Sequence, residues 1–273
     1  MKHYFIEEER LNEFCKVLTE DYRVFLPVKY VDSKNNLDFY YQELGNSGID
    51  FYFNPYRVRE PLKVFFNYPL ERVSKYFLAE DYSPEVRKTV VFGVKSCDLF
   101  AHKVQDYVFL EGNFIDSIYK KRRENTLLVS SDCIDFKEVC HCLAWDILPY
   151  PQEGFDLNLS KLNEGYIVEV GSTEAEGLIK DYPDYFIPAK ETQIQAVHIK
   201  REDFVKKLKK YIDSLNLVSK ESVQRLVREG YNLSTWKEFM LNCVECGGCN
   251  LICDTCHCFI LEDRKFNSLN EKL

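Results

Sequence analysis

The sequence lacks long apolar runs, is poor in glycine and proline, and has no excess of positive charge. No stretch approaches the roughly 18 uncharged apolar residues that a membrane-spanning helix needs. Only 11 of the 273 residues are glycine and 9 are proline, while 45% are hydrophobic, so the composition excludes a collagen-like or disordered chain. The net charge of −8 opposes binding to nucleic acid or to an anionic membrane.

Sequence motifs of nucleotide binding and catalysis are missing as well. There is no G-x-G-x-x-G dinucleotide loop and no P-loop, and no pair of groups stands out as a catalytic acid and base. The first ten residues, MKHYFIEEER, carry acids where a secretory signal needs an apolar run. We therefore expect a cytoplasmic protein that binds neither nucleic acid nor membranes.

Cysteine is the abundant exception, with 11 in the chain. Disulfides are rare in the reducing cytoplasm, where clustered cysteines indicate metal or redox chemistry instead. The chain length is sufficient for one large domain or two smaller ones. The positions of the cysteines relative to the expected strands and helices therefore carry most of the functional information.

Hydrophobic periodicity predicts a helix and then three strands near the N-terminus. Apolar residues recur at helical spacing over residues 11–18, which makes Cys15 part of the apolar face of that helix. A short helix is expected around residues 70–78, after Pro69. Runs rich in Tyr, Phe and Val, separated by turn residues, predict strands over residues 22–31, 37–44 and 49–58.

Two units of strand, loop and helix are expected in the middle of the chain. The run TVVFGV, residues 89–94, predicts a strand buried on both faces, followed by the loop KSC and a helix. A helix over residues 115–124 leads into a second apolar strand, TLLVS. Both strands end where a cysteine begins, and loops at the carboxyl ends of strands in α/β sheets are where sites are built. A hairpin and three helices are expected further on, over residues 155–170, 204–215, 220–228 and 234–241.

The strongest signal is the segment NCVECGGCNLICDTCHC near the C-terminus. Its first four cysteines have the spacing C-x2-C-x2-C-x3-C of bacterial ferredoxins, and two more follow at once. Three thiolates two residues apart on a tight loop can each bind a different iron of one cubane cluster, while Gly247 and Gly248 let the backbone pass close to the sulfides. The six cysteines are Cys243, Cys246, Cys249, Cys253, Cys256 and Cys258.

A four-thiolate zinc site is the main alternative, because such sites also use C-x2-C pairs. A zinc ribbon normally separates its two pairs by about 15–20 residues, and a packed run of four cysteines suits a single tetrahedral ion poorly. The spacing therefore favours iron–sulfur over zinc. In two-cluster ferredoxins the fourth cysteine binds the other cluster, so Cys253 need not share a cubane with the first three.

A second group of cysteines lies upstream, in the loops after the two apolar strands. Cys97 precedes a helix whose N-terminus is expected to stabilise a thiolate, and Cys133, Cys140 and Cys142 share the loop after TLLVS. If the strands are neighbours in one sheet, both loops open at the same edge and the four thiolates can converge on a second cluster. The alternative is that Cys97 is one more small buried residue and that the C-x-C pair is incidental.

Four segments resemble, in this order and at these intervals, the iron–sulfur electron-transfer proteins related to the iron–sulfur subunit of anaerobic sulfite reductase and to the sulfhydrogenase beta subunit: FGVKSCDLFAHKVQDYVFL, YKKRRENTLLVSSDC, CHC and CVECGGCNLICDTCHCF. The resemblance implies a subunit that passes electrons between a flavin-bearing partner, which handles NAD(P)H, and a catalytic partner such as a hydrogenase or sulfite reductase. It also implies two ligand sets, namely Cys97, Cys133, Cys140 and Cys142, and Cys243, Cys246, Cys249 and Cys253.

The sequence departs from this family in two respects. Family members usually continue to a second C-x2-C-x2-C-x3-C run, which this sequence does not contain, and Asp254 stands where proline commonly follows the fourth cysteine. The cubane bound by the first three cysteines then takes its fourth thiolate from Cys253, Cys256, Cys258 or a partner chain. Two 4Fe–4S clusters need eight thiolates and three need twelve, so 11 cysteines supply two clusters but not three.

These observations predict a mixed α/β fold over residues 1–198, followed over residues 199–273 by a helical segment with a C-terminal ferredoxin-like iron–sulfur loop. The expected function is electron relay by two 4Fe–4S clusters inside a cytoplasmic, hetero-oligomeric oxidoreductase complex, with catalysis left to partner subunits. Two alternatives stay open: a zinc-dependent structural or interaction module, and an enzyme whose substrate binds near Cys97. His141 and His257 lie between paired cysteines and are candidate substitute ligands, although ordinary hydrogen bonding is favoured.

Overall fold

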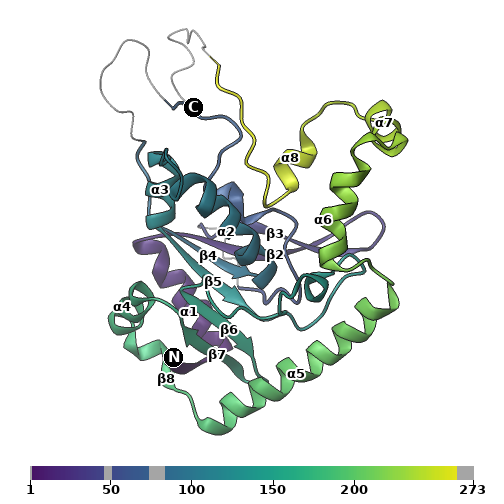
Figure 1. Cartoon of the computed structure of the whole chain (residues 1–273). Helices are drawn as coiled ribbons and strands as arrows, with labels where there is room; N and C mark the ends of the chain where they lie inside the picture. The colour runs from purple at the N-terminus through teal and green to yellow at the C-terminus, as the bar shows by residue number, and fades with distance from the viewer. Residues whose placement is uncertain (1, 46–50, 74–83, 263–273) are drawn as a thin grey trace.

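An eight-stranded mixed sheet organises the chain (Figure 1). The computed structural model describes residues 2–45, 51–73 and 84–262. Within these ranges the strands lie in the order β3-β2-β4-β5-β6-β7-β1-β8. Strands β2, β4, β5 and β6 run parallel to their neighbours in that series, and the other pairings are antiparallel. The expectation of a mixed α/β fold is confirmed.

The strands are short and alternate with helices through most of the chain. The strands are β1 His3–Glu7, β2 Arg23–Val31, β3 Leu37–Glu43, β4 Thr89–Val94, β5 Thr126–Ser131, β6 Leu157–Lys161, β7 Gly165–Val170 and β8 Ile187–Pro188. The α-helices are α1 Glu8–Val17, α2 Ser96–Leu110, α3 Ser117–Glu124, α4 Thr173–Asp181, α5 Glu191–Ser214, α6 Lys220–Glu229, α7 Ser234–Leu241 and α8 Gly248–Ile252. The 3-10 turns are η1 Leu18–Glu20, η2 Leu62–Phe65, η3 Cys142–Trp145, η4 Pro183–Tyr185 and η5 Gly230–Asn232.

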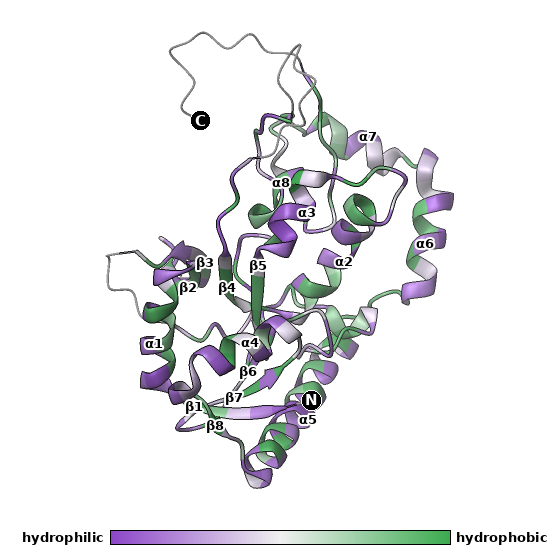
Figure 2. Cartoon of the chain, turned by 90° about the vertical axis from the view of Figure 1, so that its left-hand side faces the viewer, coloured by the Kyte–Doolittle hydropathy of each residue, from purple (hydrophilic) through white to green (hydrophobic). Residues whose placement is uncertain are grey.

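Helices cover both faces of the sheet, and each face has its own hydrophobic core. Val90 and Phe92 of β4 pack with α1 and α4 on one face, whereas Val91 packs with α2 and α3 on the other. This alternation follows from the two-residue period of a strand. All six residues of β4 are buried, as the sequence predicts for a strand covered on both faces. Figure 2 shows the apolar residues gathered along β4 and β5.

Most of the elements expected from periodicity are present. The first helix is α1, and Cys15 is buried on its apolar face together with Leu11 and Phe14. Strands β2 and β3 and the hairpin formed by β6 and β7 are confirmed. The helix expected around residues 70–78 lies mostly outside the described residues, and residues 70–73 form no helix.

The strand expected over residues 49–58 is wrong for the part that the structure describes, because residues 51–58 form a loop. Phe51 and Phe53 are buried in the same core as α1, so their aromatic character serves loop packing. The side-chain amide of Asn54 donates hydrogen bonds to the backbone carbonyl of Gly93, at 2.8 Å, and to that of Tyr56. The loop is therefore fixed by a side chain and not by a strand ladder.

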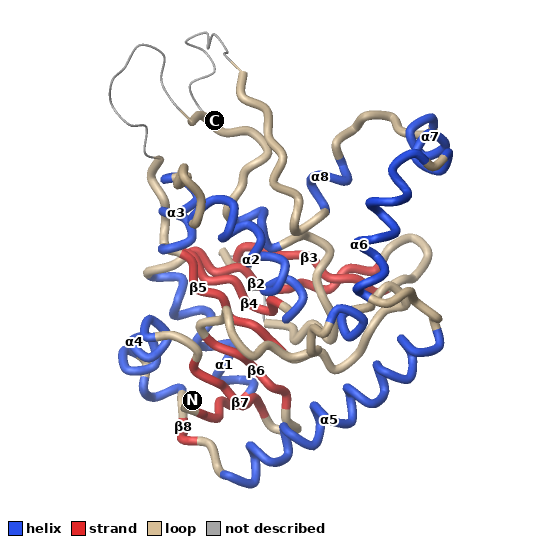
Figure 3. Tube along the Cα trace, viewed as in Figure 1, coloured by secondary structure: helices blue, strands red, loops and turns tan. Residues whose placement is uncertain are grey.

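The C-terminal helices differ from the rest of the chain because they bury little. Helix α5 crosses the position 198/199 at which the sequence suggests a division, and only four of its residues are buried. Helices α6, α7 and α8 contain no buried residue. Figure 3 shows α6 and α7 extending away from the sheet before the chain returns through α8. None of the helices among the described residues has the length and apolar character to cross a membrane.

Candidate functional site

The loops after β4 and β5 open at the same edge of the sheet, because the two strands are parallel neighbours. Cys97 is the second residue of α2, which begins directly after β4. Cys133 follows the end of β5 by two residues, Cys140 lies farther along the same loop, and Cys142 is the first residue of η3, in which the loop ends. A shared site was expected if the two strands were neighbours in one sheet, and they are.

The four upstream thiols also lie close enough to interact electrostatically. Negative charge on Cys133 and on Cys142 raises the pKa of Cys97, and charge on Cys140 and Cys142 raises the pKa of Cys133. We call these four residues the upstream cysteine site. In the described part of the chain, no three His, Cys, Asp or Glu side chains are grouped as a single metal ion requires. A cluster makes a different demand, because each thiolate binds its own iron.

Burial dominates the acidity of these thiols. It raises the pKa of Cys97 well above its usual range, with Asp98 and Cys133 adding to the rise, and it raises the pKa of Cys133 to about 12. This differs from the expectation that the start of the helix stabilises a Cys97 thiolate, because desolvation outweighs the helix terminus here. Four thiols that resist ionisation as free groups become stable thiolates only when a cation compensates them.

A buried lysine ties the two cysteine loops together. Lys95 is fully buried between β4 and Cys97, and its ammonium group donates hydrogen bonds to Asn54 O at 2.6 Å, Ser131 Oγ at 2.7 Å and Asp132 O at 3.1 Å. Burial lowers the pKa of Lys95, while the charges of Cys133 and Asp132 oppose that change. Nothing in the local sequence marks this residue as more than a loop lysine.

Helix α5 braces the same edge from the other side. Arg201 donates from Nε to Asp132 Oδ2 at 2.8 Å, and its guanidinium also binds Glu169 on β7. Farther along α5, the hydroxyl of Tyr211 donates to the backbone carbonyl of Glu138 at 2.6 Å, inside the loop that carries Cys140. Helix α5 therefore holds the cysteine loop against the sheet, a role that sequence reasoning did not assign to it.

Backbone amides point at two of the cysteine sulfurs. The Lys137 amide donates to Cys140 Sγ at 3.3 Å in the upstream site, and the Glu245 amide donates to Cys243 Sγ at 3.4 Å in the C-terminal segment. His141 and His257 each have Nδ1 within hydrogen-bond distance of a nearby backbone carbonyl, at 2.8 Å and 3.1 Å. The imidazoles thus have the ordinary partners that the sequence interpretation favoured.

The C-terminal cysteines form a short loop around α8. Gly247 has a φ of 70°, a left-handed conformation that favours glycine, and a Cβ on Gly248 would lie 3.4 Å from Cys246 Sγ. Both glycines therefore allow the close backbone turn that the ferredoxin spacing requires. Five of the six thiols are exposed and Cys256 is half-buried, whereas all four upstream thiols are half-buried.

The C-terminal cysteine segment is anchored on the α/β part of the chain. Asp254 forms an ion pair with Arg57 and accepts a hydrogen bond from the amide of Leu62 at 3.1 Å. Lys63 donates to Cys256 O at 2.8 Å and Gln105 on α2 donates to Asp254 O at 2.7 Å. These anchoring residues were missed by sequence reasoning, and the only signal for them was the aspartate at a position where the family commonly has proline.

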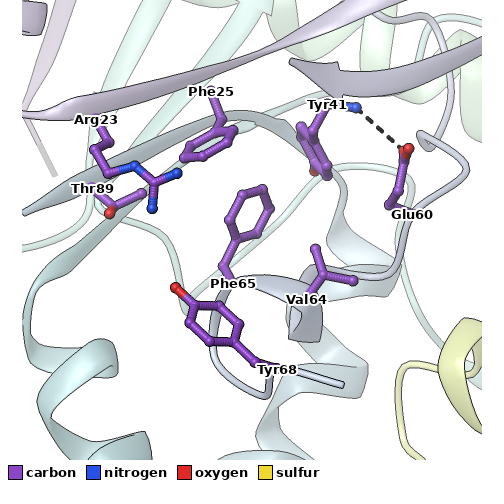
Figure 4. Close-up of a pocket in the computed structure, with 8 residues that line it drawn as sticks. All are labelled: Arg23, Phe25, Tyr41, Glu60, Val64, Phe65, Tyr68 and Thr89. Atoms are coloured by element: carbon purple, nitrogen blue, oxygen red, sulfur yellow. Dashed lines mark hydrogen bonds between the residues drawn. The ribbon is translucent and has the colours of Figure 1, made fainter. Parts of the chain in front are cut away.

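A cavity of about 310 Å³ lies between β2, β3 and η2 (Figure 4). Aromatic side chains dominate its wall, and Arg23 is held by two hydrogen bonds to Glu43, at 2.9 Å and 2.7 Å. No cysteine lines it, so the cavity does not extend the cysteine sites. The residues drawn in Figure 4 are Arg23, Phe25, Tyr41, Glu60, Val64, Phe65, Tyr68 and Thr89.

Comparison with known proteins decides the family. The sulfhydrogenase 2 subunit beta of Pyrococcus furiosus is 30% identical to this chain over 262 residues, which amount to 95% of this chain and 73% of the relative. The chain belongs to the sulfhydrogenase beta subunit family. No protein-family model and no solved structure matches this member of the family.

The upstream cysteine site of this sulfhydrogenase beta subunit relative fits a 4Fe–4S cluster. It offers four half-buried thiols from two neighbouring segments and an amide directed at the sulfur of Cys140. Burial raises the pKa of Cys97 and of Cys133, so their thiolates would need a cation beside them to be stable. The C-terminal segment has the spacing and the glycines of a cluster loop, with more exposed sulfurs.

Proposed function

We propose that the chain is an iron–sulfur electron-transfer subunit that carries two 4Fe–4S clusters within an oxidoreductase complex. The observation that carries this proposal is that β4 and β5 are parallel neighbours, so that Cys97 and the segment of Cys133, Cys140 and Cys142 follow them at one edge of the sheet. The second cluster would be held by the C-terminal cysteines, with its fourth ligand among Cys253, Cys256 and Cys258 or on a partner chain. Sequence similarity to a protein named as a sulfhydrogenase beta subunit supports the same class of function.

The residues around the upstream cysteine site have roles that suit electron transfer. A 4Fe–4S cluster supplies reversible one-electron chemistry when it is bound. Partial burial of Cys97 and Cys133 limits the access of water, and the amide of Lys137 stabilises negative charge on Cys140, which raises a reduction potential. The hydrogen bonds of Lys95 fix the spacing of the two cysteine loops, so that little reorganisation accompanies a change of charge.

The partners that we propose are a flavin-bearing subunit that handles NAD(P)H and a catalytic subunit of the hydrogenase or sulfite reductase type. Support for a hetero-oligomer comes from apolar side chains left exposed on the C-terminal helices, among them Trp236, Phe239 and Leu241 of α7. We place the complex in the cytoplasm and assign catalysis to the partners. The division into an α/β part, residues 1–198, and a cluster-bearing part, residues 199–273, also remains a proposal.

Iron and sulfide analysis of anaerobically prepared protein, combined with low-temperature EPR, tests the proposal. We expect about eight iron and eight sulfide per chain, as two 4Fe–4S clusters require. Cys133→Ser removes one of four ligands of the upstream cluster and should reduce the content to about four iron. Cys15→Ala removes a cysteine buried on α1, outside both sites, and should leave the iron content unchanged.

Three results would contradict the proposal. A colourless protein with stoichiometric zinc and no acid-labile sulfide would favour the zinc module. Equal iron content in Cys133→Ser and wild type would show that Cys133 is not a ligand of an upstream cluster. Substrate turnover by the isolated chain, without any partner subunit, would show an enzyme in its own right.

A further inference from the structure

One arginine connects the two groups of cysteines. Arg57 lies in the loop after β3, with its Nε 2.6 Å from Oδ1 of Asp98, the residue that follows Cys97. The same guanidinium forms an ion pair with Asp254, the residue that follows Cys253. A single side chain therefore contacts both groups through their sequence neighbours.

The bridge is largely shielded from water. The side chain of Asp98 is 1% exposed and that of Asp254 is 12% exposed, while Arg57 is 35% exposed. Two buried carboxylates near one another repel, so each depends on the cation between them. Asp98 is held in place as well, because its Oδ2 accepts a hydrogen bond from the Lys95 amide at 3.1 Å. The position of Asp98 is thus fixed at the upstream site, and the ion pairs of Arg57 connect it to Asp254 in the C-terminal segment.

Further contacts anchor the C-terminal cysteine segment between Asn250 and Cys256. Lys63, which is 8% exposed, donates to the backbone carbonyls of Asn250 and Cys256. The side-chain amide of Gln105 on α2 donates to the carbonyls of Asp254 and Cys256, at 2.7 Å and 3.2 Å. By contrast, α6, α7 and α8 bury no residue. The place of the C-terminal cysteines is therefore set by a few polar contacts centred on Asp254.

We propose that Arg57 is a positioning residue that locks the C-terminal cysteine segment onto the upstream cysteine site and so sets the separation across which electrons pass between the two clusters. This inference rests on the proposed function for its redox consequence, but the lock itself concerns contacts within the protein chain. The residues that make the lock are Arg57, Asp98 and Asp254, with Lys63 and Gln105 in support.

Hydrogen exchange of the full-length, metal-free protein tests the lock without any cluster. Asp254→Asn retains shape and removes the charge that pairs with Arg57. We expect amide exchange at Leu62 and over residues 250–256 to rise on the order of tenfold or more, because a charge-assisted hydrogen bond is lost. Exchange equal to wild type at these amides would overturn the proposal.

Two variants at nearby arginines sharpen the comparison. Arg57→Lys keeps one positive charge but cannot reach both carboxylates with a planar fork, so the rise in exchange should be smaller than in Asp254→Asn. Arg59→Met removes an arginine two residues away whose partner, Asp38, also pairs with Lys137. That control should leave the exchange of residues 250–256 unchanged, and an equal rise in Arg59→Met would contradict a specific role for Arg57.

The loaded protein provides the second readout. With both clusters reduced, wild type should show the EPR splitting of two magnetically interacting centres, and Asp254→Asn should lose that splitting at unchanged iron content. Unchanged splitting in this variant would contradict the role of the lock in setting cluster separation. If wild type bound no iron at all, the proposed function would fail, whereas the exchange experiment would still decide whether the lock exists.

Discussion

At the scale of single residues, Lys95 shows how much of the upstream site depends on groups other than cysteine. Its ammonium group is buried and bonded to acceptors from two segments, among them Asn54 O and Ser131 Oγ. A buried amine of this kind is stable only while its acceptors surround it, and the acceptors in turn need its protons. The alignment of the two cysteine loops therefore depends on a residue with no place in any cluster motif.

Lys95→Met tests this dependence. The substitution keeps the length of the side chain and removes its hydrogen bonds, so we expect the free energy of unfolding of metal-free protein to fall by about 2–4 kcal/mol. Chemical denaturation measures the change. Lys103→Met, at an exposed residue paired with Glu153, is the control and should alter stability by less than about 1 kcal/mol. A Lys95→Met protein as stable as wild type would show that the buried amine is dispensable.

Residues with local signatures could be predicted from the sequence, and residues with distant partners could not. The spacing of the cysteines singled out both groups, and two apolar strands placed Cys97 and Cys133 at one edge. Lys95 and Arg57 escaped notice because their partners lie far along the chain, 36 residues away for Ser131 and 197 for Asp254. No periodicity or motif encodes such pairs.

At the scale of elements, a bulge at the end of β4 shapes the approach to Cys97. The register between β4 and β5 shifts between Phe92 and Val94, and Gly93 takes a φ of 77°. A Cβ at Gly93 would lie 2.5 Å from Asn54 Oδ1 and 2.8 Å from Pro27 Cγ. Bulges re-aim the residues that follow them, so glycine here directs the chain toward Lys95 and the first turn of α2, which carries Cys97.

Gly93→Ala should therefore destabilise the fold. Strain at positive φ together with the close contacts is expected to lower the free energy of unfolding by about 2–4 kcal/mol. Gly177→Ala in α4 is a matched control, because nothing lies within 4 Å of the added carbon. In a helix the same change should raise stability by up to about 1 kcal/mol. Urea denaturation measures both, and equal midpoints for the two variants would contradict this account of the bulge.

Hydrophobic periodicity located most elements, and its failures have physical causes. Residues 51–58 have the aromatic composition of a strand, but Phe51 and Phe53 are buried from a loop whose course is fixed by Asn54. Helix α5 was expected only from residue 204, whereas it begins at Glu191. Its first half buries little besides Val197, so the apolar signal there is weak. Composition cannot separate these cases, because tertiary contacts decide them.

At the scale of the whole molecule, burial is distributed unevenly between the two ends of the chain. The hydrophobic cores lie on the two faces of the sheet and draw on residues up to Phe186, whereas α6 and α7 contain no buried residue. Local stability follows burial, so these two helices should open far more readily than the sheet. The structure thus combines a well-packed α/β part with two helices, α6 and α7, that bury no residue.

Hydrogen exchange across the whole chain tests this distribution. In metal-free protein we expect amides of α6 and α7 to exchange at least about 100-fold faster than those of β4 and β5, because few apolar contacts oppose opening. Binding of iron and sulfide should slow exchange over residues 243–258 and leave β4 and β5 unchanged, since metal binding contributes to local folding. Protection of α6 and α7 equal to that of the sheet would contradict this distribution of stability.

The chain leaves the α/β part at the end of α5, passes through α6 and α7, and returns to it at Asp254. These residues form a closed loop, which affects how readily the segment at Asp254 re-attaches. Re-attachment after a transient release is intramolecular, and a flexible tether of this kind typically supplies an effective concentration in the millimolar range. The entropy of closure grows only with the logarithm of loop length, so doubling the excursion would cost about 0.6 kcal/mol. A small set of polar contacts at Asp254 therefore suffices to return the C-terminal cysteines to their position, even when α6 and α7 open.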